Sequence, residues 1–192
     1  NDTTITPRTL VHRVRTSLPD DGILTLDNGM YKIWFARHYA TKQENTLLLD
    51  NALATMGAGL PSAIAAKLLH PDRPVTTVTG DGGFMMNSQE LETAMRLGLD
   101  LTIVILNDQS FKMIRWKQHA QGLEDYGLEF NNPDFGLYAK SYGAHSMTAQ
   151  TPDELSQALA ESTERGGVNI IDVAIDYSTN DKDISFHHAF SS

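Results

Sequence analysis

Two short stretches of the sequence decide its fold: Val75-Thr-Thr-Val-Thr-Gly-Asp-Gly-Gly-Phe84 and Leu101-Thr-Ile-Val-Ile-Leu-Asn-Asp108. Each begins as a run of β-branched and apolar residues and ends in a polar or glycine-rich cluster, which is typical of a buried strand and the turn that follows it. Residues 87–97, between the two strands, are predicted to form one helix. This order indicates a βαβ unit whose parallel strands have their carboxyl ends at the same edge of the sheet.

Strands and helices alternate along the rest of the chain as well. Further strands are predicted at 23–26, 45–49, 144–147 and 168–175, and further helices at 7–17, 30–39, 52–67, 132–143 and 151–165. The pattern predicts a three-layer α/β fold with a central parallel sheet of about six strands, in one domain that covers residues 1–192. Residues 1–6 are expected to be disordered or a linker remnant, and 118–130 to form either a mobile lid or a plain surface loop.

Composition narrows the class of protein. The chain has 192 residues, of which 41% are hydrophobic, and it contains no Cys, so disulfides, thiolate metal sites and a Cys nucleophile are excluded. With a net charge of −9 and scattered basic residues, nucleic acid is not an expected partner. No apolar run is long enough to span a membrane, and no signal peptide is evident. We expect a cytoplasmic protein, although the lack of Cys does not by itself establish that address.

The polar residues at the predicted sheet edge indicate a site for a phosphorylated ligand. Gly82 and Gly83 leave backbone N–H groups open to an anion, and a helix N-terminus follows. Asp81 and Asp108 would repel a bare phosphate, and a divalent cation between them and the phosphate removes this conflict. Mg²⁺ fits best, because it takes a few carboxylates together with phosphate oxygens. The alternative is an ordinary tight turn in which the two Asp residues cap helices.

The same residues resemble a known family. Gly80-Asp81-Gly82, followed after 24 residues (83–106) by Asn107-Asp108, is similar to the signature of thiamine-diphosphate-dependent enzymes. The sequence of residues 85–97 and 105–118 resembles the carboxyl-terminal cofactor-binding domain of acetolactate synthase large subunits. The resemblance extends from about residue 27 to about 181. It implies a thiamine-diphosphate-binding fold, with thiamine diphosphate and Mg²⁺ as cofactors. It further implies an enzyme that decarboxylates a 2-keto acid, such as pyruvate, and ligates the product to a second keto acid.

The resemblance also implies a role for individual residues. Asp81, Asp108 and the carbonyl of Ser110 would hold the metal, and Met56 would wedge the cofactor into a folded V. The carbonyl of Ala54 and the N–H of Met56 would hold the aminopyrimidine. The full set of expected cofactor-binding residues is Asn28, Gly29, Ala54, Thr55, Met56, Gly80, Asp81, Gly82, Gly83, Asp108, Ser110, Phe111, Lys112, Met113 and Ile114.

The chain departs from the family pattern at several of these places. Asp108 stands where Asn is common, and Ser110 where Gly is usual, which removes easy access to positive φ there. Tyr31 replaces a His that many relatives place over the substrate. Relatives that select a second keto acid often carry a Trp at the position of Lys117, whereas here Trp116 lies one place earlier. The choice of acceptor and product therefore stays open.

Two other motifs are given weaker interpretations. Gly57-x-Gly59-x-x-Ser62 is an incomplete dinucleotide-binding pattern, because the third glycine and the later acidic residue are missing. We expect Gly57, Gly59, Ala63 and Ala66 to permit close helix–sheet packing instead. The adjacent His187 and His188 near the end of the chain are expected to be solvated rather than metal-bound.

One part of the expected active site has no candidate in the sequence. In the family a Glu from a pyrimidine-binding domain, contributed across a dimer interface, activates the cofactor, and no Glu of this chain has the required context. We therefore expect a fragment or subunit of a larger enzyme, working as a homodimer or tetramer with that domain in the same longer chain or in a separate subunit. The alternative is a stand-alone cofactor-binding module of another keto-acid decarboxylase, inactive without its partner.

Overall fold

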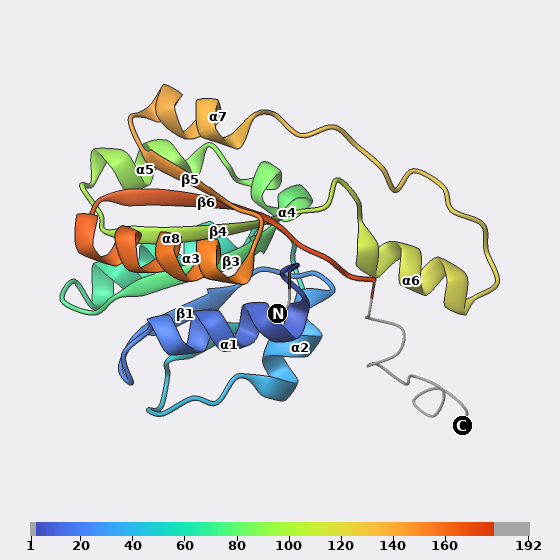
Figure 1. Ribbon diagram of the computed structural model, residues 1–192, viewed down its shortest axis with the longest axis horizontal. Helices are drawn as coiled ribbons and strands as arrows, with labels where there is room; N and C mark the ends of the chain where they lie inside the picture. Colours follow the sequence, from blue (N-terminus) through green and yellow to red (C-terminus); the bar gives the residue numbers. More distant parts are fainter. Residues whose placement is uncertain (1–2, 179–192) are drawn as a thin grey trace.

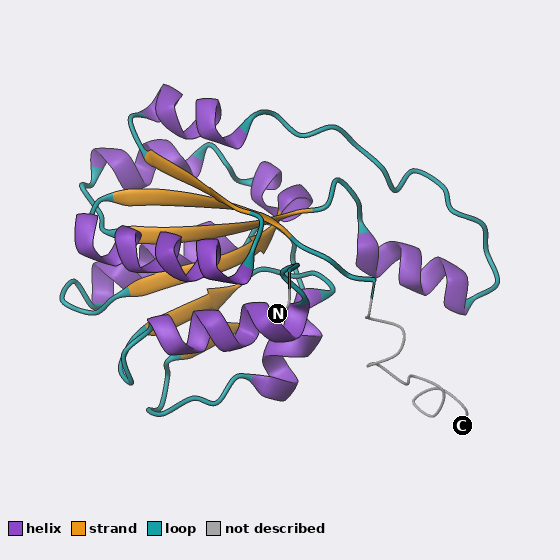
Figure 2. Cartoon of the chain, in the orientation of Figure 1, coloured by secondary structure: helices purple, strands orange, loops and turns teal. Residues whose placement is uncertain are grey.

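The computed structural model describes residues 3–178 and has an α/β architecture built on one open sheet (Figures 1 and 2). All six strands are parallel and lie in the order β2-β1-β3-β4-β6-β5. This confirms the predicted three-layer fold with a parallel sheet of about six strands. The strands are β1 Ile23–Leu26, β2 Leu47–Leu49, β3 Val75–Gly80, β4 Leu101–Asn107, β5 His145–Ala149 and β6 Val168–Ala174.

Helices cover both faces of the sheet (Figure 1). One apolar core lies between the sheet and α1, α2 and α8, and the other lies between the sheet and α3, α4, α5 and α7. The inner strands β1, β3, β4 and β6 are buried on both sides and read as apolar or β-branched runs, whereas the edge strands β2 and β5 are partly exposed. The helices are α1 Pro7–Ser17, α2 Tyr31–His38, α3 Gly59–Leu69, α4 Asp81–Met86, α5 Glu90–Arg96, α6 Lys112–Ala120, α7 Phe135–Tyr142 and α8 Pro152–Arg165.

Helix α6 is the exception, because only its partly buried Met113 and Trp116 pack against the first of these cores. None of its residues is buried, and it projects beyond the carboxyl end of the sheet before a long segment returns to α7 (Figure 1). None of the helices within residues 3–178 is long and apolar enough to cross a membrane.

Local sequence signals account for several helix ends. The Thr6 side chain caps α1 by accepting from the N–H of Thr9, and Pro7 takes the first helical position. Thr151 and Glu154 form a complete capping box at the start of α8. Gly143 ends α7 in the left-handed conformation, at φ 82°.

The structure corrects four expectations. The helix predicted at 87–97 is present as α5 but begins at Glu90, and it is preceded by a short helix that was not predicted, α4, which begins at Asp81 inside the glycine-rich motif. Helix α3 begins at Gly59 rather than near residue 52. The segment expected to be a loop from 118 onward starts with the last turn of α6. Ile5, expected to be disordered, is fully buried and bridges to Ile175.

The small residues of α3 behave largely as expected. Gly59, Ala63 and Ala66 are buried, and a Cβ on Gly59 would lie 3.0 Å from the side chains of both Asp27 and Thr77. Gly57 differs, because it has a φ of +87° and contacts the side chains of Met86 and Asn87 rather than the sheet. His187 and His188 lie outside the described residues.

The order of the strands places a crevice at the carboxyl ends of β1 and β3. From β1 the chain moves outward to β2, and then crosses to β3 on the other side of β1. Open α/β sheets bind ligands at the carboxyl ends of strands beside such a reversal. The glycine-rich motif and the first turn after β1 both lie at this position.

Candidate functional site

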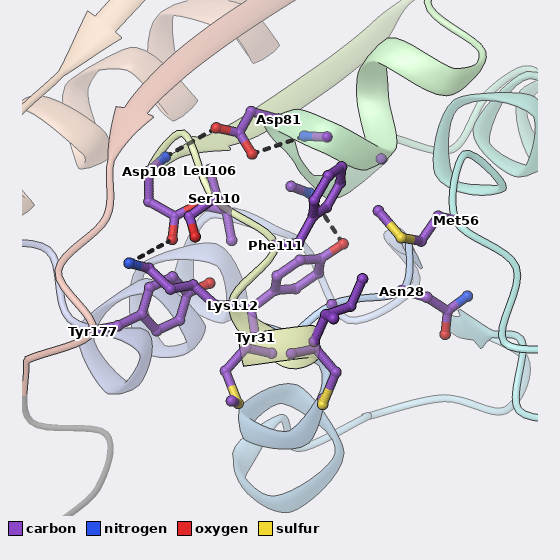
Figure 3. A pocket seen from close by; sticks show the side chains of 17 residues that line it. Asn28, Tyr31, Met56, Asp81, Leu106, Asp108, Ser110, Phe111, Lys112 and Tyr177 are labelled. Atoms are coloured by element: carbon purple, nitrogen blue, oxygen red, sulfur yellow. Dashed lines mark hydrogen bonds and ion pairs between the residues drawn. The ribbon is translucent and has the colours of Figure 1, made fainter. Parts of the chain in front are cut away.

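A pocket lies at the carboxyl ends of β1, β3 and β4 (Figure 3). Thirteen of the fifteen expected cofactor-binding residues line it, and the two that do not, Ala54 and Thr55, lie in an exposed loop beside it. The other lining residues are Met30, Tyr31, Leu106 and Tyr177. In Figure 3 Met56 and Asp108 lie on opposite sides of the pocket, with Phe111 and Tyr31 between them.

Asp81 is buried at the first position of α4, with 2% of its surface exposed. Its Oδ2 accepts from the N–H groups of Asp108 (3.1 Å) and Gln109 (2.7 Å) and from Nδ2 of Asn132 (2.7 Å). Its Oδ1 accepts from the N–H of Gly82 (2.7 Å). The carboxylate therefore joins the β3 and β4 turns, as the βαβ unit predicts, and one of its oxygens carries a single hydrogen bond.

Asp108 and Ser110 present oxygen atoms without partners. Asp108 Oδ2 and Ser110 Oγ are buried and accept or donate no hydrogen bond, while Lys112 Nζ lies 3.7 Å from Asp108 Oδ2. Burial, followed by the charge of Asp81, raises the pKa of Asp108 from 3.8 to about 7, and Lys112 acts in the opposite direction. A buried carboxylate in this state is stabilised in its ionised form by a cation placed beside it.

These oxygen donors fit a hard divalent cation. Among the described residues no group of three or more acidic or His side chains could hold a metal, so the protein's own shell here is incomplete. Two carboxylates and a loop oxygen are the kind of partial shell that Mg²⁺ completes with phosphate oxygens and water. Asp81, Asp108 and Ser110 are the residues that would hold such an ion.

The loop after β4 adopts positive φ at a different residue than its sequence suggests. Gln109 has a φ of +54°, and Ser110 does not enter the left-handed region. The serine at 110 therefore causes no backbone strain, and the expected difficulty at this departure from the family pattern does not arise. The strain falls on Gln109, whose N–H donates to Asp81.

Gly82 lies so close to an aromatic ring that a side chain would not fit there. A Cβ at this position would lie 2.6 Å from Cε1 of Phe111. The ring of Phe111 in turn packs against Phe130, with centroids 4.7 Å apart. The glycine thus allows the loop after β4 to close over the start of α4, where an anion would bind.

The loop that carries Met56 is held by side chains at the ends of neighbouring elements. Asp50 accepts from the N–H groups of three loop residues, and Asn28 donates through Nδ2 to the Thr55 carbonyl (2.7 Å). Lys32 Nζ joins these two anchors, because it donates to Asn28 Oδ1 and to the Asp50 carbonyl. The side chain of Asn28 is therefore used in supporting the loop.

Asp27 is the most buried of these anchors, and the sequence analysis did not assign it a role. It is 1% exposed, and its carboxylate accepts from the N–H groups of Gly57 (2.9 Å) and Gly59 (3.2 Å) and from the Thr79 hydroxyl (3.2 Å). It also accepts from the N–H of Asn28. Asp27 therefore ties β1, β3 and the start of α3 together directly behind Met56.

We expect Asp27→Ala to lower the free energy of unfolding strongly. Each buried donor left without a partner costs about 1–3 kcal/mol, and this substitution leaves several donors without a partner at once. Urea unfolding of the two chains measures the difference. Asp50→Ala is the matched control, since Asp50 also accepts from three N–H groups but at an exposed position, and its effect should be clearly smaller. Equal losses would contradict the importance of burial.

Two tyrosines form further parts of the pocket wall. The N–H of Gly80 donates to the Tyr31 hydroxyl oxygen (3.1 Å), so this side chain contacts the glycine-rich turn itself. Burial, followed by the charge of Asp27, raises the pKa of Tyr31 well above its usual value, and burial together with Asp108 and Asp81 does the same for Tyr177. Both phenols stay protonated and can donate to an anion.

The comparison with known proteins now defines the class. Residues 27–173 match the family model "Thiamine pyrophosphate enzyme, C-terminal TPP binding domain", where TPP is another name for thiamine diphosphate. The chain belongs to this family, which confirms the resemblance seen in the sequence and identifies it as a thiamine-diphosphate-binding domain.

Two of the relatives are acetolactate synthases. The chain is 35% identical over 174 residues to acetolactate synthase of Bacillus subtilis (strain 168), covering 91% of this chain and 30% of the relative. It is 34% identical over 173 residues to acetolactate synthase isozyme 2 large subunit of Escherichia coli (strain K12), covering 89% and 32%. It thus spans about a third of the length of these relatives.

A solved structure supports the fold alone. The Rhodococcus jostii RHA1 thiamine diphosphate-dependent 4-hydroxybenzoylformate decarboxylase superposes with a TM-score of 0.84 at 24% identity, over 92% of this chain and 33% of that one.

Proposed function

We propose that the chain binds thiamine diphosphate together with Mg²⁺, as the carboxyl-terminal domain of an acetolactate-synthase-like enzyme. The observation that carries this proposal is Asp108 Oδ2, a buried oxygen without a hydrogen bond that lies 3.7 Å from Lys112 Nζ, beside Asp81 at the edge of the sheet. The Ser110 carbonyl, the third expected ligand, accepts from the N–H of Lys112 (3.0 Å), and the Ser110 hydroxyl is a second buried oxygen without a hydrogen bond. Unpaired buried oxygens are costly, and a cation with its phosphate ligands would satisfy them. The test is calorimetric titration of thiamine diphosphate into the complete protein with and without Mg²⁺, where we expect binding only with the metal.

The residues of the pocket then have distinct tasks. Asp81, Asp108 and Ser110 hold the metal, while the N–H groups at the start of α4 and the side chain of Lys112 lie where they can neutralise the diphosphate. The loop at 54–56 would hold the aminopyrimidine, and Met56 would support the folded form of the cofactor. When bound, thiamine diphosphate supplies the electron sink for loss of CO₂ from a 2-keto acid.

No pocket-lining residue in the part of the chain that the structure describes is left to activate the pyrimidine. Within the described residues, Asp81 and Asp108 are the acidic side chains that line it, and both are assigned to the metal. We therefore infer that a Glu from a pyrimidine-binding domain completes the site, in a cytoplasmic homodimer or tetramer. Leu53 supports this inference, because this loop residue beside the pocket is 85% exposed and would be covered by such a partner.

For the reaction, we propose decarboxylation of pyruvate and ligation to a second keto acid. The acetolactate synthases among the relatives support this choice. The second candidate is a cofactor-binding subunit of another keto-acid decarboxylase, because the structural neighbour is itself a thiamine diphosphate-dependent decarboxylase. Product analysis after incubation of the complete enzyme with pyruvate distinguishes them, since ligation gives a longer keto acid and simple decarboxylation gives an aldehyde.

We expect Met56→Ala to lower turnover more than cofactor affinity. Truncation removes the apolar support under the bend of the cofactor, whereas the diphosphate and metal contacts at Asp81 and Asp108 are on the other side of the pocket (Figure 3). Turnover of the saturated enzyme and calorimetric affinity, measured on the same preparation, separate the two effects. Met85→Ala, at a half-exposed Met outside the pocket lining, is the control. A collapse of affinity with normal turnover would identify Met56 as core filler.

A further inference from the structure

The segment from Lys112 to Phe130, here named the arm, is held together by its own contacts. Arg115 pairs with Asp125 (2.9 Å) and Glu129 (3.0 Å), and His119 Nε2 lies 2.6 Å from Asp125 Oδ1. These contacts join α6 to the segment that returns from it, while the arm as a whole projects away from the sheet (Figure 1). The arm therefore has its own internal ion pairs, while Met113 and Trp116 at its start pack against the core of the sheet.

Both ends of the arm lie at the loop after β4, which carries Asp108 and Ser110. Ser110 forms an antiparallel bridge with Glu129, and the N–H of Phe111 donates to the Leu128 carbonyl (2.9 Å). The N–H of Phe130 donates to the Gln109 carbonyl (3.2 Å). The two chain segments that connect the arm to the sheet are thus hydrogen-bonded to each other beside Asp108.

Asn132, just beyond the arm, contacts the metal site directly. Its Nδ2 donates to Asp81 Oδ2 (2.7 Å) and to Asn107 Oδ1 (2.9 Å), so both amide hydrogens are used. Asn107 Nδ2 in turn donates to Asp172 Oδ1 (3.1 Å). This chain of amides runs from β6 through β4 to Asp81 and fixes the position of Asn132 against the ends of these strands.

The hydrogen bonds of Asp81 are distributed unequally as a result. Oδ2 accepts three, one of them from Asn132, and its acceptor capacity is filled. Oδ1 accepts one, from the N–H of Gly82. The arrangement holds the carboxylate in one rotation and leaves Oδ1 as the oxygen available to a cation.

We propose that Asn132 is a positioning residue for Asp81 and that it couples the order of the arm to the occupancy of the metal site. The inference rests on the proposed binding of Mg²⁺ and thiamine diphosphate. Because coupling between two sites is reciprocal, an arm that stabilises the metal-binding position of Asp81 is itself stabilised when the metal binds. Partners outside the first ligands of a metal contribute to its affinity in this manner.

The test uses the complete enzyme and two readouts other than activity. Asn132→Leu keeps the approximate volume of the side chain and removes both donors, and Asn131→Ala, at the exposed neighbouring residue, is the control. Mg²⁺ affinity at saturating thiamine diphosphate is measured by calorimetry, and hydrogen exchange is measured on peptides covering 121–130. For Asn132→Leu we expect affinity to fall about tenfold to a hundredfold, as for loss of a hydrogen bond to a charged group, and the control to change less than about twofold.

Hydrogen exchange tests the coupling in the unmodified protein. In the wild type, Mg²⁺ added with the cofactor should slow exchange in 121–130, and in Asn132→Leu this slowing should be lost even when the metal is saturating. Unchanged Mg²⁺ affinity in a folded Asn132→Leu protein would overturn the positioning role. Arm exchange in the wild type that does not respond to Mg²⁺ would overturn the coupling without any variant. Failure of the wild type to bind Mg²⁺ and thiamine diphosphate would instead refute the proposed function.

Discussion

Asp81→Ala is expected to abolish Mg²⁺-dependent binding of thiamine diphosphate. The side chain is buried at the end of β3, accepts four hydrogen bonds and would supply one of two carboxylate ligands to the metal. Without it, Asp108 alone faces the ion, and the loop after β4 loses the acceptor that joins it to α4. Since residues that merely support a metal ligand contribute about 10–100-fold to affinity, loss of the ligand itself should cost more than a hundredfold.

Calorimetry with and without Mg²⁺ measures this effect, and far-UV circular dichroism shows that the variant is folded. Asp81→Asn keeps the shape and most of the neutral hydrogen bonding, so it separates loss of charge from loss of packing. Asp153→Ala, at an exposed carboxylate in α8 far from the pocket, should bind as the wild type does. Undiminished binding by Asp81→Ala would refute the metal assignment.

The second large effect concerns the chain of residues 1–192 by itself, which we expect not to decarboxylate pyruvate at a useful rate. Among residues 3–178, the pocket lining has no carboxylate free to activate the pyrimidine, and general acid–base help of this kind is typically worth about 10²–10⁴-fold. The loop at 51–55 is also exposed to solvent, so water would reach the bound cofactor and weaken the electrostatic interactions around it.

The measurement saturates the purified chain with thiamine diphosphate and Mg²⁺ and follows exchange of the cofactor's C2 proton by NMR together with release of CO₂. Cofactor and metal without protein give the background, and the complete enzyme gives the reference. Rates close to the reference would show that a Glu of this chain reaches the pyrimidine. The candidates would then be Glu44, Glu90, Glu92, Glu124, Glu129, Glu154, Glu161 and Glu164.

The inner strands were predictable because each is a β-branched or apolar run that is buried on both faces, whereas the edge strands β2 and β5 are partly exposed. The main error lies at the glycine-rich motif, where Gly82 and Gly83 suggested a turn before a helix at 87. Both residues instead adopt helical backbone, so α4 starts directly at the end of β3. Glycine in a sequence signals freedom of the backbone, and the contacts of Phe111 and Asp27 in the folded chain decide how that freedom is used.

The pocket was predictable to the extent that it follows the strand ends and the family motif. Asp27 had a usable signal, since it is an acidic residue directly after the first strand, at the same edge as the motif. No pattern in the sequence predicts the contact of Asn132 with Asp81. Asn132 follows a long segment without sheet or helix periodicity, and it reaches Asp81 only because the arm folds back to the sheet. Interactions that depend on the path of such a segment do not show in local patterns.

The position of β6 has a consequence for how the chain is made. It is the last strand in sequence, yet it lies inside the sheet, between β4 and β5. Until Val168–Ala174 has been synthesised, β4 therefore presents an open apolar edge, and β5 has no strand to pair with. The sheet is therefore complete only after residues 168–174 have been synthesised. A nascent chain interrupted before residue 168 would expose a strand edge that favours aggregation, and this part of the protein would depend on chaperones during synthesis.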